Sequence, residues 1–221
     1  MRLGRIFLLL AFILLLTKLW TMNRERYAKK HATAPATVTA PAALGRCMSP
    51  EEMHHGYDRK ELFGTWTDVD HDCRNSRAET LEHSSLAPVD DACTIHEGEW
   101  FDPYTGDTLT RASDLDIDHI VPLKEAWLSG AFAWTREERV AYANDPEVLL
   151  AVGKHANRQK SDQDPAHWMP DNEAFRAEYA QRWSRIKLRF HLTADSLERA
   201  ALSAAGVSQL PTLAEAGCAA P

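Results

Sequence analysis

The sequence has few cysteines, and none of them is paired at the spacing of a metal-binding finger. The four cysteines are Cys47, Cys73, Cys93 and Cys218, and none belongs to a C-x-x-C pair. A structural zinc site of the paired-cysteine type is therefore not expected. An even number of cysteines in an exported chain favours disulfides, and Cys73–Cys93 would close a loop of about 20 residues. Cys47–Cys218 would then join the two ends of the domain, whereas four buried free thiols are the alternative.

The chain also lacks an excess of positive charge. Its formal net charge is −7, and residues 47–221 alone contain 17 Lys/Arg against 31 Asp/Glu, a net charge of −14. Such a body repels nucleic acid at long range unless a cation or a local basic face intervenes. The net charge of the domain therefore does not attract a polyanionic ligand.

The hydrophobic run near the amino terminus is short for a membrane span. Residues 6–16 are eleven apolar residues behind Arg2 and Arg5, which is typical of a secretory signal, whereas a spanning helix needs about 20 residues. No small-x-small cleavage site follows closely. We expect residues 1–22 to be a cleaved signal peptide or an uncleaved anchor, with residues 6–22 as a membrane tether. The protein is then secreted, or held on the outer face of the cytoplasmic membrane.

The remaining sequence divides into a spacer and one folded domain. Residues 23–46 end in a Thr/Ala/Pro stretch without a period, which indicates an extended spacer. Residues 47–221 are expected to form the domain, and no internal repeat is visible. With 44% hydrophobic and 26% charged residues, the composition excludes collagen, coiled coils, multi-span membrane proteins and fully disordered chains.

The local patterns predict a mixed α+β domain with C-terminal helices. Strands are expected at 92–100, near Leu109 and at 115–121, with a turn at 102–106 and a brief strand or turn at 148–152. Helices are expected at 49–62, 77–83, 135–142 and 171–190, and a last helix capped by Thr193 ends near Gly206. Short strands that form hairpins exclude a doubly wound parallel sheet.

The residues that can perform chemistry lie in two segments. The first is Asp116-Ile117-Asp118-His119-Ile120-Val121-Pro122-Leu123, and the second is His155-Ala156-Asn157-Arg158-Gln159-Lys160-Ser161-Asp162-Gln163-Asp164-Pro165. A strand that ends at Pro122 lets Asp118 and His119 border one pocket. Hard oxygen ligands suit a divalent cation, and a neutral imidazole can take a proton from water. The two segments together predict a water-activating magnesium site.

The pattern D-x-D-H-I-V-P-L followed by N-R-x-K-S-D-x-x-P resembles the HNH, or ββα-metal, nuclease motif. It is similar to the HNH domain of the RNA-guided CRISPR nucleases. Over residues 57–192 the chain resembles the secreted bacterial HNH endonucleases, which share their domain with the carboxy-terminal part of the GmrSD restriction enzymes. The segments that carry this wider resemblance are Tyr57-Asp58-Arg59, Phe63-Gly64, Trp66, Cys73, Arg77, residues 102–106, Trp127, Gly130-Ala131, Trp134 and Asn144-Asp145-Pro146.

The resemblance implies a role for each matching residue. His119 corresponds to the general base, Asp118 and Asn157 to metal ligands, and Asp116 to a residue near the ion. Lys160 would face the scissile phosphate or brace the loop. The cofactor implied is a divalent metal ion, with Mg²⁺ favoured over Mn²⁺ or Zn²⁺. One departure concerns Val148, which occupies the place of an asparagine that usually pins the loop carrying the base, and this predicts a slower enzyme.

The expected substrate is nucleic acid, DNA before RNA, cleaved with little sequence specificity, and no obligate protein partner is expected. The candidates for contacting its phosphates are Arg77, Arg158, Arg182 and Arg185. The last two lie on one helical face with Arg189, near Arg176 and Lys187; a solvated or salt-bridged face is the alternative.

A second cluster favours another class of protein. Asp68, Asp70, Asp72 and Glu79 occupy positions 1, 3, 5 and 12 of an EF-hand-like loop, although Cys73 replaces the glycine at position 6. The competing hypothesis is therefore a non-catalytic extracellular calcium-binding or adhesion module on a decayed nuclease scaffold.

Overall fold

The computed structural model describes residues 56–90 and 92–211. The helices there are α3 (Arg59–Phe63), α4 (Ser76–Ser84), α5 (Leu123–Leu128), α6 (Arg136–Ala143), α7 (Lys154–Lys160), α8 (Glu173–Arg189) and α9 (Ser196–Ala204). The strands are β1 (Glu97–Phe101), β2 (Thr108–Arg111), β3 (Leu115–His119) and β4 (Leu149–Gly153), and short 3₁₀ turns occupy Ala112–Asp114 and Ala131–Ala133. The strands form two antiparallel pairs, β1 with β2 and β3 with β4. The expected α+β class is confirmed.

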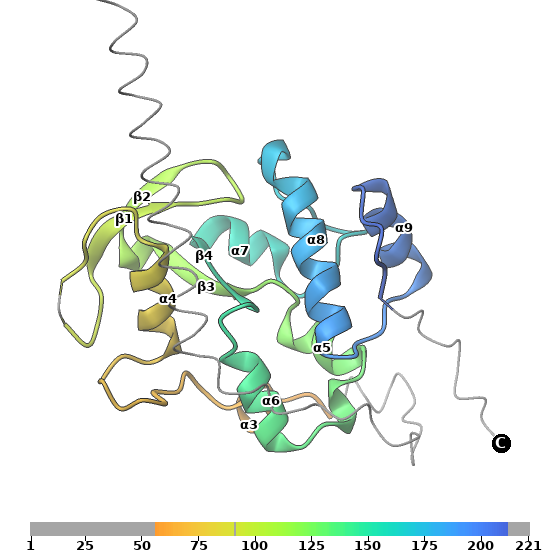
Figure 1. The fold of residues 1–221 in the computed structure, drawn as a ribbon, viewed down its shortest axis with the longest axis horizontal. Coiled ribbons are helices and arrows are strands. Elements are labelled where there is room, and N and C mark those ends of the chain that lie inside the picture. Colours follow the sequence, from red (N-terminus) through yellow and green to blue (C-terminus); the bar gives the residue numbers. More distant parts are fainter. Residues whose placement is uncertain (1–55, 91, 212–221) are drawn as a thin grey trace, which may run out of the picture. The chain divides into compact units, whose positions relative to one another are not determined.

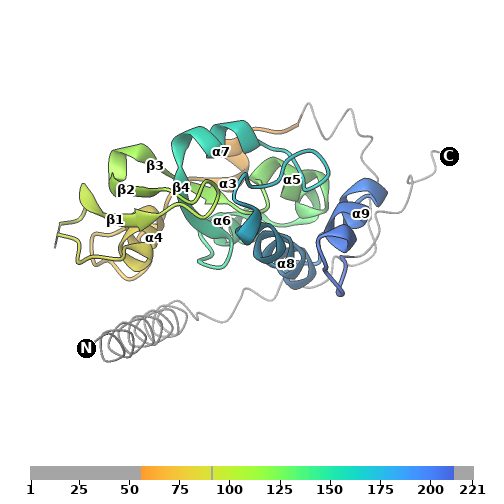
Figure 2. The ribbon, with the colours of Figure 1, turned by 90° about the horizontal axis from the view of Figure 1, so that it is seen from above.

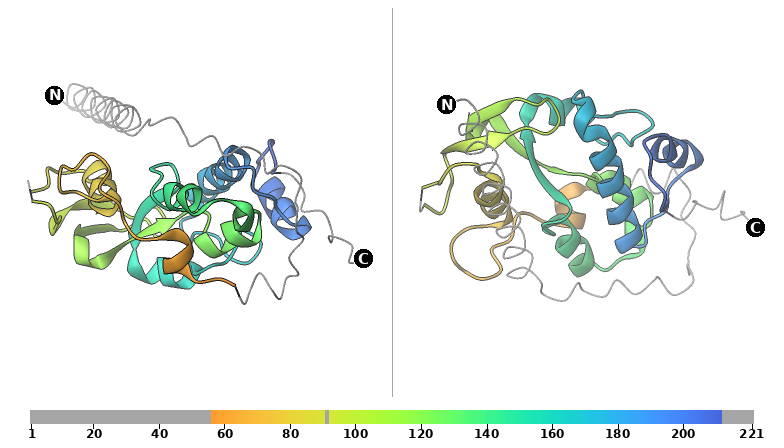
Figure 3. Two further views of the ribbon diagram at one scale, coloured as in Figure 1. Left: turned by 90° about the horizontal axis from the view of Figure 1, so that it is seen from below. Right: turned by 45° about the horizontal axis from the view of Figure 1, so that its top comes forward.

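The β3/β4 pair lies at the centre of the described part of the chain (Figure 1). On one side of it lie α4 and the β1/β2 pair, and on the other side lie α8 and α9, an arrangement that persists in the further views of Figure 3. Seen from above, α7 lies beside β3 and β4 (Figure 2). The central β3/β4 pair therefore separates two apolar cores.

The larger core contains aromatic residues of the helices that follow β3. Its fully buried members include Tyr104, Tyr142, Tyr179 and Trp183. The smaller core joins α4 to one face of the β3/β4 pair. Leu115 and Ile117 point into the smaller core, so strand alternation places Asp116 and Asp118 on the opposite face of β3.

Local capping explains where several helices begin. Thr135 and Glu138 form the expected capping box of α6, and Asp58 caps α3 by accepting the Glu61 N–H. The expected buried stripe of α8 is confirmed for Tyr179, Trp183 and Ile186. The turn at 102–106 is also confirmed, because the Gly106 N–H donates to the Asp102 carbonyl.

Several expected boundaries are wrong. The strand expected from residue 92 begins at Glu97, and the one expected to reach residue 121 ends at His119. Asp195, not Thr193, caps α9, because its carboxylate accepts the N–H groups of Leu197 and Glu198. Thr193 instead bonds to the Ser129 carbonyl. Helix α5 was not expected. Pro122 was interpreted as the end of a strand, but a proline is equally compatible with the start of a helix.

The Cys73–Cys93 disulfide is formed, as expected. Cys47, Cys218, the leader at 1–22 and the spacer at 23–46 lie outside the described residues, as does the beginning of the helix expected at 49–62. No helix within the described ranges has both the length and the apolar character that crossing a membrane requires.

Candidate active site

Three consecutive elements bring the two motif segments together. Strand β3 pairs with β4 so that His119 lies opposite Leu149, and β4 runs directly into α7. Asn157 lies in the first turn of α7, where its Nδ2 donates to Asp116 Oδ2 at 3.3 Å. This ββα arrangement places Asp116, Asp118, His119 and Asn157 within one site.

His119 is buried and its ring orientation is fixed. Its Nε2 lies 2.9 Å from the Ala143 carbonyl oxygen, and its ring is stacked on Trp66 with centroids 5.5 Å apart. Because a carbonyl oxygen only accepts, Nε2 carries the hydrogen and Nδ1 is the nitrogen with a free lone pair in the neutral ring. Burial, with Arg59 and Lys160 nearby, lowers the pKa of His119 to about 3, against the opposing hydrogen bond to Ala143. The imidazole is therefore neutral near pH 7.

Asp118 is held at both oxygens. Its Oδ1 accepts from Lys160 Nζ at 2.9 Å and its Oδ2 accepts from the Tyr104 hydroxyl at 2.6 Å. Burial raises the pKa of Asp118, while Lys160 and Tyr104 oppose that rise. Lys160 is 0% exposed and also donates to the His119 carbonyl at 3.0 Å. Of the two roles expected for Lys160, its position fits the brace and leaves no access to a phosphate.

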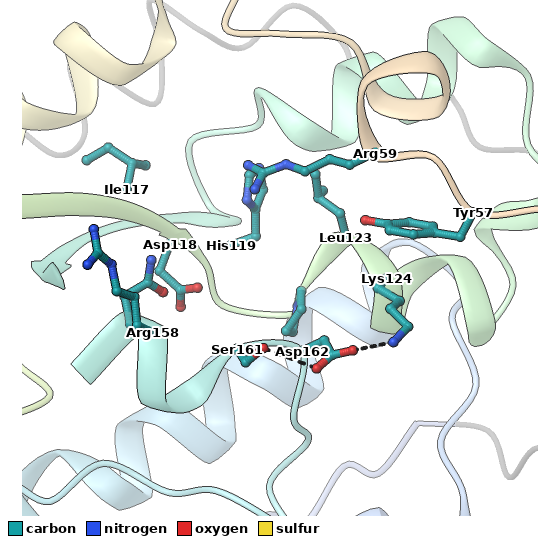
Figure 4. Close-up of a pocket in the computed structure, with 12 residues that line it drawn as sticks. Tyr57, Arg59, Ile117, Asp118, His119, Leu123, Lys124, Arg158, Ser161 and Asp162 are labelled. Carbon is teal, nitrogen blue, oxygen red and sulfur yellow. Dashed lines mark hydrogen bonds and ion pairs between the residues drawn. The ribbon is translucent and has the colours of Figure 1, made fainter. Parts of the chain in front are cut away.

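A cavity of about 460 Å³ opens over Asp118 and His119. Its walls include Tyr57 and Arg59 from the start of the described chain, Lys124 from α5, and Asn157 and Arg158 from α7. Figure 4 shows the Arg59 side chain extending toward His119, while Arg158 rises from α7 on the opposite side of the view. Lys124 is paired with Asp162 at 2.6 Å. The expectation that Asp118 and His119 border one pocket is confirmed.

Sequence reasoning assigned no role to Tyr57, Arg59, Tyr104 or Lys124. Tyr57 and Arg59 belong to a segment that carries the family resemblance. The resemblance marked the segment but indicated no chemical role for either residue. Tyr104 lies in the expected turn at 102–106, and only the fold shows that its hydroxyl reaches Asp118.

The chain matches the family model described as GmrSD restriction endonucleases, C-terminal domain, over residues 71–205. The chain belongs to this family. It is also 36% identical over 173 residues to an uncharacterized secreted protein of Arthroderma benhamiae, a match that covers 76% of this chain and 84% of the relative. That relative is fungal, so similarity to this chain is not confined to bacterial proteins. No solved structure matches the chain.

The acidic and amide side chains of this GmrSD C-terminal domain fit a hard divalent cation. Asp118, Asp116 and Asn157 supply oxygen donors, which Mg²⁺ and Mn²⁺ prefer, whereas zinc sites favour nitrogen and sulfur. Each oxygen of Asp118 accepts one hydrogen bond and so retains a second lone pair. The amide of Asn157 donates through Nδ2, which leaves its carbonyl oxygen for a cation.

The other predicted substrate contacts, Arg77, Arg182 and Arg185, do not line the cavity, although Arg182 is close enough to Asp118 to oppose the rise in the pKa of its carboxyl group that burial causes. Arg77 donates to the carbonyls of Ala112 and Leu115, where it supports the start of β3. Arg182 and Arg185 lie on α8, Arg182 half-buried and Arg185 exposed. A role of these two arginines in binding substrate stays a prediction.

The three other cations of α8 all form ion pairs with carboxylates, Arg176 with Glu173 at 3.4 Å. Arg189 pairs with Asp145 at 2.7 Å and with Glu147 at 3.0 Å. Lys187 is fully buried between Glu125 and Glu198, at 2.6 and 2.7 Å, and so does not contribute to an exposed face.

The second acidic cluster of this GmrSD C-terminal domain lies in the loop before α4. Carboxylate oxygens of Asp68, Asp70 and Asp72 lie within 4.8 Å of one another. Cys73, at the loop position where an EF-hand has glycine, adopts a left-handed conformation with φ of 73°. Glu79 is buried in α4.

Proposed function

We propose that the protein is an exported, metal-dependent HNH-type endonuclease that hydrolyses phosphodiester bonds of nucleic acid, DNA before RNA. The observation that carries the proposal is the position of His119. Its Nε2 lies 2.9 Å from the Ala143 carbonyl oxygen, which leaves Nδ1 to accept a proton, and His119 lines the same cavity as Asp118. Burial, which lowers its pKa, keeps the ring neutral near pH 7. The family membership supports a nuclease-related activity.

In the proposed mechanism, His119 Nδ1 accepts a proton from the attacking water. Lys160 and Tyr104 hold the Asp118 carboxylate, and Lys160 also fixes the His119 carbonyl, so the base and the acidic group keep their relative positions. Asp118 and Asn157, with Asp116 beside them, would hold a divalent cation, Mg²⁺ before Mn²⁺ or Zn²⁺. When bound, such a cation supplies charge stabilisation to the phosphoryl and leaving oxygens.

In this proposal, two arginines would bind the phosphates on either side of the reacting group. Arg59 and Arg158 are exposed, line the cavity, and form no ion pair within the described ranges. An arginine without a carboxylate partner, at the mouth of a cavity in a protein of net charge −7, is suited to bind a phosphodiester. Such contacts are independent of base identity, which agrees with little sequence specificity.

The secreted relative and the Cys73–Cys93 disulfide support an extracellular location. A tether through residues 6–22 and a cleaved leader remain two alternatives for the amino terminus. Analysis of the amino-terminal residue of exported protein decides between them.

The direct test of the proposed function is nicking of supercoiled plasmid by the full chain. We expect conversion to the open-circular form with Mg²⁺ or Mn²⁺ and none in the presence of a chelator. Single-stranded DNA and RNA of the same length, assayed in parallel, determine the preferred substrate. No cleavage of any of the three with any divalent cation would refute the proposal.

The clustered carboxylates of Asp68, Asp70 and Asp72 favour one competing function, a calcium-binding module. In that case Ca²⁺ binds with a measurable heat that Asp70→Asn abolishes, and the protein cleaves no nucleic acid. Calorimetry with Ca²⁺, combined with the plasmid assay, separates the two functions.

A further inference from the structure

Two contacts fix the ring of His119, and both belong to segments that a single asparagine ties together. Nε2 donates to the carbonyl of Ala143, and the planes of the His119 and Trp66 rings are 3° apart in the stack. Ala143 directly precedes Asn144, at the end of α6. Trp66 lies between Thr65 and Thr67, in the segment that follows α3.

The side chain of Asn144 uses both ends of its amide. Its Oδ1 accepts the Thr67 N–H at 2.9 Å and also accepts from the Ser76 hydroxyl. Its Nδ2 donates to the Thr65 carbonyl at 3.2 Å and to the Val140 carbonyl at 2.9 Å. A carboxamide has two donor hydrogens and two principal acceptor sites, so all four are used.

These bonds join three parts of the chain around the ring. The bonds to Thr65 and Thr67 hold the residues on either side of Trp66, and the bond to Val140 holds the last turn of α6, which ends at Ala143. The bond from Ser76 anchors the group to the first residue of α4. The Ala143 carbonyl and the Trp66 indole therefore cannot move away from the His119 ring unless Asn144 breaks hydrogen bonds.

We propose that Asn144 is the positioning residue of this active site: its amide holds the Ala143 carbonyl and the Trp66 indole in place and so fixes the direction of His119 Nδ1. This inference rests on the proposed nuclease function. Val148 contributes through its backbone, since its carbonyl accepts the Ile120 N–H at 2.9 Å and its apolar side chain is fully buried. The side chain that pins the loop is Asn144, four residues earlier.

The kinetic test compares Asn144→Ala with the parent and with Asp195→Ala. The control variant loses two hydrogen bonds that cap α9, a helix packed on α8. We expect Asn144→Ala to lower kcat by about 10- to 100-fold, because a misdirected base is costly. KM and the midpoint of the Mg²⁺ titration should change less than twofold, since no substrate contact or metal ligand is removed. A kcat no lower than that of Asp195→Ala would overturn the proposal.

Two further variants keep the test decisive if Asn144→Ala does not fold. Asn144→Asp retains the acceptor atoms and loses the bonds to Thr65 and Val140, and Ser76→Ala removes one bond to Oδ1. Both should lower kcat in the same direction and by less. Unchanged kcat in both folded variants would contradict the proposed positioning role.

A measurement without catalysis separates this inference from the proposed function. In ¹⁵N-histidine-labelled full chain, the Nε2 hydrogen of His119 should give a slowly exchanging NMR signal, because it is buried and bonded to Ala143. The signal should exchange rapidly in Asn144→Ala or Asn144→Asp and slowly in Asp195→Ala. Equal protection of the His119 Nε2 hydrogen in the parent and all three variants would overturn the inference. If the variants show the expected differences in exchange but the parent cleaves no nucleic acid, only the nuclease function is refuted.

Discussion

Lys160 is the residue on which the geometry of Asp118 and His119 depends most. It is completely buried, and its ammonium group reaches the carboxylate of one and the carbonyl of the other. Burial lowers the pKa of Lys160, while the contact with Asp118 opposes that change. Since the lysine has no access to solvent, its contribution is to hold the carboxylate and the strand end rather than to touch substrate.

Replacing this lysine should be costly for stability. Lys160→Met leaves the Asp118 carboxylate buried without its ion pair, which costs on the order of 3–5 kcal/mol. Lys124→Met is the matched control, because Lys124 and Asp162 are 36% and 42% exposed and such a pair contributes about 0–1 kcal/mol. Urea unfolding of both variants measures the difference. Equal losses in the two variants would show that Lys160 is not a buried brace.

At the scale of elements, the loop closed by Cys73 and Cys93 includes all of α4. Helix α4 packs on β3 and β4, so the disulfide stabilises one face of the β3/β4 pair. Its sulfur atoms lie on residues outside the cavity over His119. Stability and catalytic chemistry are therefore separable in this part of the molecule.

Removing the disulfide should destabilise the domain without changing the catalytic groups. Closure of a loop of about 20 residues is worth roughly 3 kcal/mol in the chain-entropy model. We expect Cys73→Ser/Cys93→Ser to lower Tm by several degrees and to leave kcat, measured well below Tm, within about twofold of the parent. A kcat that falls with an unchanged Tm would assign the disulfide to the active site instead.

The sequence predicted the elements whose signals are local. The capping box at Thr135, the apolar stripe of α8 and the turn at 102–106 were all visible, because each depends on residues three or four positions apart. The long-range partners were not visible. Nothing near Tyr104 indicates Asp118, and nothing near Asn144 indicates Thr65 or Ser76, since folding alone brings these residues together.

The charge on α8 illustrates the same limit. From the sequence, Lys187 and Arg189 extend the expected basic face of Arg182 and Arg185. In the fold, both have acidic partners contributed by distant segments: Lys187 by α5 and α9, and Arg189 by the residues after α6. A helical wheel shows which residues share a face, but it does not show whether another element neutralises that face.

At the scale of the whole molecule, α5, α8 and α9 meet at one buried ionic group. Glu125 and Glu198 share the single ammonium of Lys187, and Trp183 Nε1 donates to Glu198 at 2.5 Å. Burial raises the pKa of Glu198 to about 7, since Lys187 offsets only part of the effect and Glu125 adds to it. Between its ordinary value of 4.5 and about 7, the folded state therefore binds a proton that the unfolded state does not.

This predicts a component of stability that is present at low pH and lost as the pH rises through 7. This contribution to the free energy of unfolding is fully present below about pH 4.5, the ordinary pKa of a glutamate side chain such as Glu198. Glu198→Gln removes the titration and retains an acceptor for Trp183. We expect the free energy of unfolding of the parent, minus that of the variant, to fall by on the order of 2 kcal/mol between pH 5 and pH 8. A difference that is independent of pH would contradict this account of Glu198.

The location of the substrate surface is tested by salt dependence. In a His119→Ala background, DNA affinity should fall with salt with a slope of roughly −2 to −3, as expected for two or three phosphate contacts. Arg59→Ala and Arg158→Ala should each reduce the slope by about one, while Arg182→Ala and Arg185→Ala should leave it nearly unchanged. A slope that responds to the α8 arginines instead would place the DNA on that helix.

The central claim is that His119 is the general base of a metal-dependent nuclease, and its most direct test is the cleavage rate of His119→Ala. Single-turnover cleavage of plasmid DNA at saturating Mg²⁺ should be slower than in the parent by several orders of magnitude, on the order of 10²–10⁴-fold. The Mg²⁺ titration midpoint should stay close to that of the parent, whereas Tm should fall, because the variant loses the buried ring with its hydrogen bond to Ala143 and its stack on Trp66. Cleavage at the parental rate by the folded His119→Ala protein would contradict the account.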